Sequence, residues 1–166
     1  LVTRYQHNPI LLPNKDNPWE AKAVFNASPV RKDNKIYILY RALSRKHFHN
    51  EVNLEMEISS IGLAESLDGL NFENRRQFII PDTEWDRYGC EDPRVTFFEG
   101  KYYIFYTALS GYPFSKDTIK VGCAVSPDLN KIEYKRLVTP FNAKAMTLFP
   151  ERIGGKIWVA LTINTD

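Results

Sequence analysis

The chain has 166 residues, of which 43% are hydrophobic and 25% are charged. These shares are typical of a folded domain and disfavour disordered, collagen-like and membrane-spanning proteins. With 22 Lys and Arg against 20 Asp and Glu, the formal charge is only +2, too small and too evenly spread for a nucleic-acid-binding surface. We therefore expect neither nucleic acid nor a membrane as a partner.

The cysteines and histidines do not indicate a disulfide scaffold or a metal site. Cys90 and Cys123 have no metal-like spacing and are too few to staple a secreted fold, so we expect reduced, buried thiols. His47 and His49 have no third ligand near them in the sequence. The N-terminus has no signal-peptide layout and begins at Leu1 rather than Met, so we expect a trimmed N-terminus and a cytoplasmic location.

An internal repeat organises the chain. Residues 35–42 (KIYILYRA) match residues 101–108 (KYYIFYTA) at five of eight positions. Further along, residues 61–68 (IGLAESLD) and 121–128 (VGCAVSPD) share Gly, Ala, Ser and Asp in register. A third copy begins at residues 149–161 (FPERIGGKIWVAL). Two matches in the same order indicate repeated supersecondary units.

Each copy predicts short strands in a fixed order. An apolar strand is followed by a turn, at residues 33–34, 99–100 or 154–155, and then by a β-branched and aromatic strand. After an insert come the strand with the Gly-x-Ala pattern, an Asp turn and a short strand at residues 71–73 or 131–134. The insert residues 53–58 alternate in polarity and are expected to be extended rather than helical.

Four antiparallel strands per repeat are typical of a β-propeller blade. We therefore predict an all-β chain with one propeller domain over residues 1–166 and repeats near residues 24–75, 88–136 and 147–166. The repeats, at roughly 60 residues each, exceed common propeller repeats because of long inserts. The chain would supply about the first two and a half blades, and because a closed ring needs at least about four, we expect residues 1–166 alone to be poorly stable.

Polar residues that break the repeat are the candidate site residues. Arg41 ends an apolar strand where the next repeat has Thr107, and a guanidinium there suits an anionic or hydroxyl-rich ligand or pairs two blades. Asn26 ends the first apolar strand at the place that Glu91 and Asp92 hold in the second repeat. Trp19 and Trp85 fit either sugar platforms or core positions.

The segment from Glu91 to Arg94 places two carboxylates and a guanidinium beside an apolar strand. Pro93 should push Asp92 into an extended conformation, so that Glu91 and Asp92 point to different sides. A carboxyl group in an enclosed setting can have a raised pKa and act as a general acid. A capped turn with a salt bridge is the alternative interpretation.

The ordered motifs resemble glycoside hydrolase family 130. They are NPIL at residues 8–11, YRA at 40–42, GCEDPR at 89–94, YTA at 106–108 and FPE at 149–151. The resemblance implies a five-bladed β-propeller that acts on β-mannosides with inversion, as a phosphorylase or a hydrolase. It also implies an oligosaccharide substrate and no cofactor, with inorganic phosphate as co-substrate in a phosphorylase. The oligomeric state stays open, with a homo-oligomer as one option.

Carried over by position, the resemblance makes Asp92 the general acid and places Asn26, Arg41, Glu91 and Arg94 at the mannose subsite. Lys144 corresponds to a basic residue for phosphate. The family's phosphorylases follow the third Gly-Lys strand with His-Arg, whereas residues 161–162 here are Leu-Thr. Because one Lys alone holds a dianion poorly, we favour hydrolysis slightly over phosphorolysis, with a non-catalytic carbohydrate-binding propeller as a further alternative. The catalytic base or further phosphate ligands are expected beyond Asp166.

Overall fold

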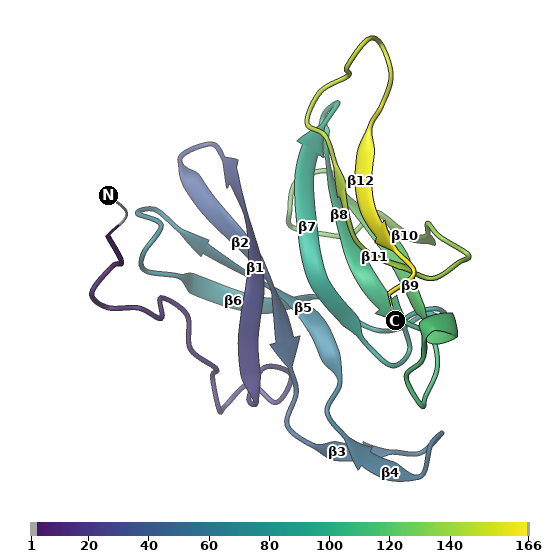
Figure 1. The fold of residues 1–166 in the computed structure, drawn as a ribbon. Coiled ribbons are helices and arrows are strands. Elements are labelled where there is room, and N and C mark those ends of the chain that lie inside the picture. The colour runs from purple at the N-terminus through teal and green to yellow at the C-terminus, as the bar shows by residue number, and fades with distance from the viewer. Residues whose placement is uncertain (1–2, 166) are drawn as a thin grey trace.

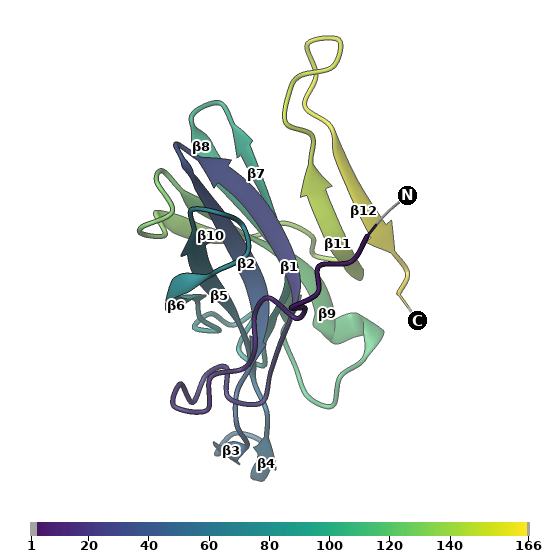
Figure 2. The same cartoon turned by 90° about the vertical axis from the view of Figure 1, so that its left-hand side faces the viewer.

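The computed structural model describes residues 3–165 and consists of antiparallel sheets arranged side by side (Figures 1 and 2). The first sheet has the order β1 (Ala23–Lys32), β2 (Lys35–Leu43), β5 (Ser59–Ser66) and β6 (Glu73–Ile79). The second contains β7 (Cys90–Phe98), β8 (Lys101–Leu109), β9 (Ile119–Ser126) and β10 (Tyr134–Leu137). A third sheet consists of β11 (Ala143–Leu148) and β12 (Val159–Ile163). The predicted four-stranded blades are confirmed, and the chain forms part of a propeller.

The inserts lie between the second and third strands of each blade, as the repeat length indicates. In the first blade the insert forms the hairpin β3 (His47–His49) and β4 (Leu54–Met56), which confirms the extended prediction. In the second blade it holds one 3₁₀ turn, η1 (Lys116–Thr118). Both inserts lie at the lower end of the molecule in Figure 1. Within residues 3–165 no helix is long and apolar enough to cross a membrane.

Local sequence explains the tight turns between the first two strands of each blade. Lys32 pairs with Lys35 and Phe98 pairs with Lys101, so each turn has two residues. Glu99 and Gly100 both have positive φ, 46° and 83°, which the twist of a two-residue hairpin favours. Glycine takes this conformation without steric cost.

The main core lies between the first two blades. Leu39, Ile61 and Leu63 of the first blade pack with Ile104 and Ala124 of the second, and all five are fully buried. The opposite face of the second blade packs against β11. Both cysteines are free and buried, as expected. Trp85 packs against the main core, which favours the core interpretation for that residue.

Each complete blade also contains a buried triad of a carboxylate, a tyrosine and a cation. In the first blade the Tyr40 hydroxyl donates to Glu20 at 2.9 Å, and Arg75 pairs with the same carboxylate oxygen at 2.7 Å. In the second blade the Tyr106 hydroxyl donates to Asp86 at 2.8 Å, and Lys135 pairs with the same oxygen at 2.7 Å. The carboxylates of Glu20 and Asp86 are fully buried, so both need these partners. We call the first strand of each sheet (β1, β7 and β11) its inner strand. The triads connect the segment before the inner strand of each complete blade to the second and fourth strands of that blade.

Candidate functional site

A β-bulge recurs in the inner strand of each blade. The pairing register shifts between Phe25 and Ser28 in β1, between Glu91 and Arg94 in β7, and between Lys144 and Thr147 in β11. Within these bulges Asn26, Asp92 and Ala145 have φ of 52°, 50° and 54°. The shared register shift and positive φ make the three positions equivalent, and only their side chains differ. Bulges redirect side chains and often lie next to functional sites.

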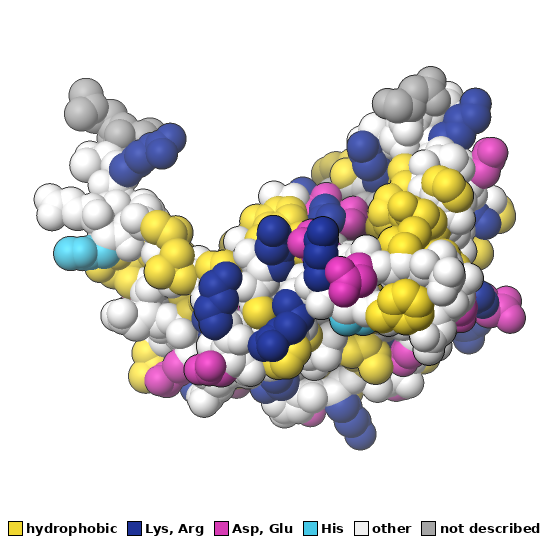
Figure 3. Space-filling model, turned by 90° about the horizontal axis from the view of Figure 1, so that it is seen from below, with side chains coloured by type: hydrophobic (Ala, Val, Ile, Leu, Met, Phe, Trp, Pro, Cys, Tyr) yellow, Lys and Arg dark blue, Asp and Glu magenta, His cyan; other side chains and the backbone are white. Residues whose placement is uncertain are grey.

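The bulges bring the predicted polar residues of two blades together at the lower end of the sheets. The Asn26 amide donates to Asp92 Oδ1 at 2.7 Å, across the boundary between the blades. Arg41 forms an ion pair with Glu91, and its Nη1 lies 3.7 Å from Asp92 Oδ1. Arg41 Nε donates to Ser59 Oγ at 2.9 Å. We call these five residues (Asn26, Arg41, Ser59, Glu91 and Asp92) the Arg41 cluster. In the view from below, basic and acidic side chains gather near the middle of the face (Figure 3).

The expected backbone conformation of Asp92 is wrong. Its φ of 50° lies in the left-handed region, because the bulge supplies the extra residue there. Pro93 does disfavour a right-handed helical conformation at Asp92, but the strand register decides the outcome. As a result the side chains of Glu91 and Asp92 do not point to different sides of the strand as expected. Both carboxylates lie near Arg41.

The two adjacent carboxyl groups have different environments. Burial raises the pKa of Glu91, the Arg41 guanidinium opposes this and the Asp92 charge adds to it, with a net upward shift. The Glu91 side chain is 17% exposed and the Asp92 side chain 31%. Asp92 is therefore the carboxyl group that a ligand can reach more easily, although the raised pKa expected at this site belongs to Glu91.

Two further predicted residues lie outside the Arg41 cluster. Arg94 donates to the carbonyl of Pro93 at 2.9 Å. Lys144 is exposed in β11 and pairs with Thr162 in the same register in which Glu91 pairs with Thr107. Lys144 therefore occupies, on the third inner strand, the position that Glu91 occupies on the second.

Sequence reasoning missed Ser59 and Phe25. Ser59 starts β5 at the repeat position that Ile119 holds in β9, so it breaks the repeat as Arg41 does and the same criterion could have identified it. The Phe25 ring lies under the Arg41 guanidinium at 4.9 Å from its centroid. An exposed aromatic side chain in a strand carries no signal that separates this role from ordinary packing.

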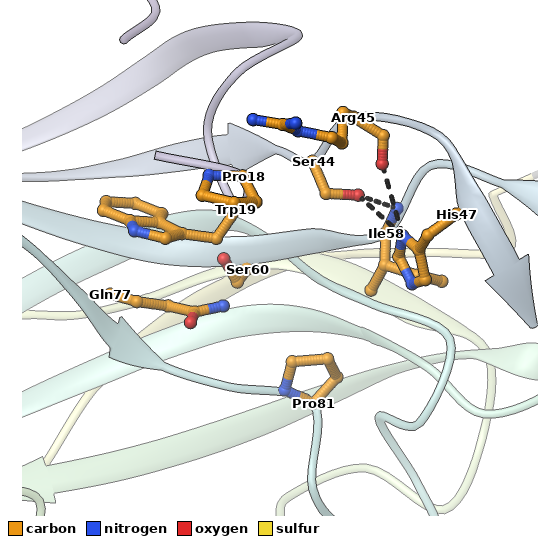
Figure 4. A pocket seen from close by; sticks show the side chains of 9 residues that line it. All are labelled: Pro18, Trp19, Ser44, Arg45, His47, Ile58, Ser60, Gln77 and Pro81. Atoms are coloured by element: carbon orange, nitrogen blue, oxygen red, sulfur yellow. Dashed lines mark hydrogen bonds between the residues drawn. The ribbon is translucent and has the colours of Figure 1, made fainter. Parts of the chain in front are cut away.

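Trp19 lines a different pocket, on the other face of the first blade. The other residues that line this pocket are Pro18, Ser44, Arg45, His47, Ile58, Ser60, Gln77 and Pro81 (Figure 4). Ser60 faces this pocket while its neighbour Ser59 contacts Arg41, so the strand β5 separates the two. The corresponding face of the second blade, which carries Tyr106, is covered by the first blade. The pocket is therefore not the site of the Arg41 cluster.

The histidines of the first insert have structural contacts. The His49 ring stacks on Tyr88 with centroids 5.3 Å apart, and His47 Nδ1 lies 3.5 Å from Ser44 Oγ. Tyr88 also donates to Glu51 at 3.2 Å. These contacts fasten the hairpin β3–β4 to the segment that precedes Glu91.

Comparison with known proteins gives a consistent result. The family whose sequence model matches residues 3–165 is glycoside hydrolase family 130, described as β-1,4-mannooligosaccharide phosphorylase. A β-1,2-mannobiose phosphorylase and a 1,2-β-oligomannan phosphorylase, both from a Thermoanaerobacter strain, are 36% and 32% identical over 96% and 97% of this chain. The structure of the β-1,2-mannobiose phosphorylase from Listeria innocua in complex with β-1,2-mannobiose superposes on 98% of this chain and 59% of its own, with a TM-score of 0.77 and 19% identity. The chain spans 57% and 56% of the two curated relatives.

Proposed function

Since this chain belongs to glycoside hydrolase family 130, we propose that the protein is a phosphorylase that transfers mannose from a β-mannoside to inorganic phosphate. The observation that supports acid-catalysed cleavage of the mannoside is the Arg41 cluster, in which Asp92 is the more exposed of two adjacent carboxyl groups and is held by Asn26. The two curated relatives, both phosphorylases, support phosphorolysis better than the hydrolysis that the sequence alone favoured. The substrate class is a β-linked manno-oligosaccharide.

In this reaction Asp92 is the general acid. Its proton passes to the glycosidic oxygen, directly or through a hydroxyl group of the bound mannose, as the bond between that oxygen and the anomeric carbon breaks. A phosphate oxygen forms the new bond to the anomeric carbon from the opposite side, so a β-mannoside gives α-mannose 1-phosphate. General acids contribute rate factors of about 10² to 10⁴. Asn26 holds one oxygen of the Asp92 carboxylate.

Phosphate requires a basic site on the opposite side of the sugar. Lys144 is exposed on the third inner strand and supplies one positive charge. Its strand partner is Thr162, which has no charge to add. A phosphate dianion needs more than one cationic partner, so we expect further cationic ligands in addition to Lys144.

Hydrolysis is the second candidate, because residues 161–162 are Leu-Thr in place of the His-Arg of the phosphorylases that the sequence resembles. In that case water takes the place of phosphate and a second carboxylate serves as base. The cluster as described serves either reaction, since the proton donor is common to both.

The test is to incubate the full-length protein with β-1,2- and β-1,4-mannobiose, with and without phosphate. We expect mannose 1-phosphate only when phosphate is present, and no product from an Asp92→Asn variant. Free mannose without phosphate would favour hydrolysis. If Asp92→Asn keeps the wild-type rate, the assignment of the acid is wrong, and if the wild type forms no product from any manno-oligosaccharide, a carbohydrate-binding role is favoured.

A further inference from the structure

The guanidinium of Arg41 has a protein group near each of its three nitrogen atoms. Its Nε donates to Ser59 Oγ at 2.9 Å and its Nη2 pairs with Glu91. Its Nη1 faces Asp92 Oδ1 at 3.7 Å, and the Phe25 ring lies below its plane. Two of the three nitrogens therefore have a protein partner within hydrogen-bond distance, and the third faces the proposed acid at a longer distance.

One oxygen of the Glu91 carboxylate contacts both Arg41 and Ser59. This oxygen, Oε1, is the partner of Arg41 and also accepts from Ser59 Oγ at 3.3 Å. The three side chains come from three strands, β2, β5 and β7, which belong to two blades. They form a closed ring of contacts, while the adjacent Asp92 stays more exposed.

This network is absent from the other repeats within residues 3–165. Thr107 and Thr162 replace Arg41, and Ile119 replaces Ser59. Phe25 and Lys144 hold the register position of Glu91. Because the blades fold without it elsewhere, the network is not a requirement of the blade architecture, and its place beside Asp92 indicates a role at the site.

We propose that Glu91 is a positioning residue, which fixes Arg41 with the help of Ser59 and thereby sets the orientation of Asp92. This inference rests on the proposed function, since it assigns a role within the same site. Glu91 neutralises the Arg41 charge, so that the guanidinium stays at 3.7 Å from Asp92 instead of closing on it. The other charged group that faces Glu91 is Asp92 itself, on the same strand.

A Glu91→Gln substitution keeps the shape of the side chain and removes its charge. Arg41 then has Asp92 as its remaining anionic partner in the cluster, and closing on it turns the carboxylate away from the glycosidic oxygen. A misplacement of about 1 Å can reduce a rate about 100-fold. We therefore expect kcat in the full-length protein to fall by about that factor while KM stays within about twofold, because an interaction that serves only the transition state is lost.

The pH profile separates this role from a merely structural one. Without the Glu91 charge, Arg41 favours the ionised form of the acid, so we expect the basic limb of the kcat/KM profile to move to lower pH. The matched control is Glu84→Gln, which removes one carboxylate from an exposed position in the same segment. Its kcat, KM and pH profile should equal those of the wild type.

A second variant, Ser59→Ala, keeps the test decisive if Glu91→Gln does not fold. It removes the bridge between Arg41 and Glu91 and leaves both charges, so it should lower kcat in the same direction by a smaller factor. A raised KM with unchanged kcat in either variant would show that Glu91 contacts substrate and would overturn the proposal.

A crystal structure of Glu91→Gln gives a readout that does not depend on activity. The proposal requires Arg41 and Asp92 to move relative to the wild type, and their staying in place would overturn it. An inactive wild-type protein would instead contradict the proposed function, and the structure of the variant would still test the positioning role.

Discussion

The tight contact between Gly122 and the Tyr106 ring in the second blade predicts a large effect from one added methyl group. A Cβ atom added to Gly122 would lie 2.5 Å from Tyr106 Cζ and 2.7 Å from its hydroxyl oxygen. The Tyr106 ring is only 2% exposed, so it has no free space into which it can move. If the ring shifts, its hydroxyl also leaves Asp86, whose carboxylate is fully buried.

The magnitude follows from these two effects. Overpacking of a filled core costs about 1–3 kcal/mol, and the loss of a hydrogen bond to a buried polar group adds about 1–3 kcal/mol. We expect Gly122→Ala to lower the free energy of unfolding of the full-length protein by about 2–6 kcal/mol, measured as a shift of the urea midpoint with the m-value unchanged. Since Asp86 precedes the inner strand that carries Asp92, the enzymatic activity of Gly122→Ala should fall together with its stability.

Gly111→Ala is the matched control. Its Cβ would lie 2.9 Å from Thr118 Cγ2, a methyl group at the end of a half-buried side chain on the second insert that can turn away. We expect a cost below about 1 kcal/mol there. If the two substitutions shift the urea midpoint equally, the Tyr106–Asp86–Lys135 triad does not fix this part of the blade and the reasoning is refuted.

Two further predictions concern the thiols and the bulge. Burial raises the pKa of Cys123 to about 12 and raises the pKa of Cys90 as well. Neither thiol should therefore react with iodoacetamide at pH 8 in the folded protein, and both should react in urea. Rapid labelling of the native protein would contradict the buried, protonated state. Asn26→Gly retains the positive φ of the bulge but removes the amide that holds Asp92. We therefore expect kcat to fall while the urea midpoint changes little. An unchanged kcat would show that the Asn26 contact does not serve the reaction.

The repeat made the blades predictable from the sequence. The same Gly-x-Ala, Tyr and turn residues recur because the same contacts occur in each complete blade. For example, Gly62 lies close to the Tyr40 ring and Gly122 lies close to the Tyr106 ring. The buried carboxylates Glu20 and Asp86 were not predicted, although each follows a Trp and they lie at the same offset as residues 35–42 and 101–108. The sequence shows that these positions are equivalent, but only the structure shows that both carboxylates are buried against a tyrosine and a cation.

Four of the five members of the Arg41 cluster could be predicted from the sequence, but their geometry could not. Asn26, Arg41, Glu91 and Asp92 were identified because they break the repeat, and the structure brings them together. Their orientation depends on a bulge, which is a property of the register between two strands and leaves no local mark on the sequence. For this reason Pro93 alone led to the wrong conformation for Asp92, and the partnership of Arg41 with Ser59 was missed.

The most direct test of the central claim follows phosphate in a reaction of the full-length protein with β-1,2-mannobiose by ³¹P NMR, for the wild type and for Asp92→Asn. We predict that the wild type converts inorganic phosphate into α-mannose 1-phosphate and that the variant leaves the phosphate signal unchanged. Release of mannose from the wild type with no consumption of phosphate, or phosphate consumption at the same rate in both proteins, would contradict the account.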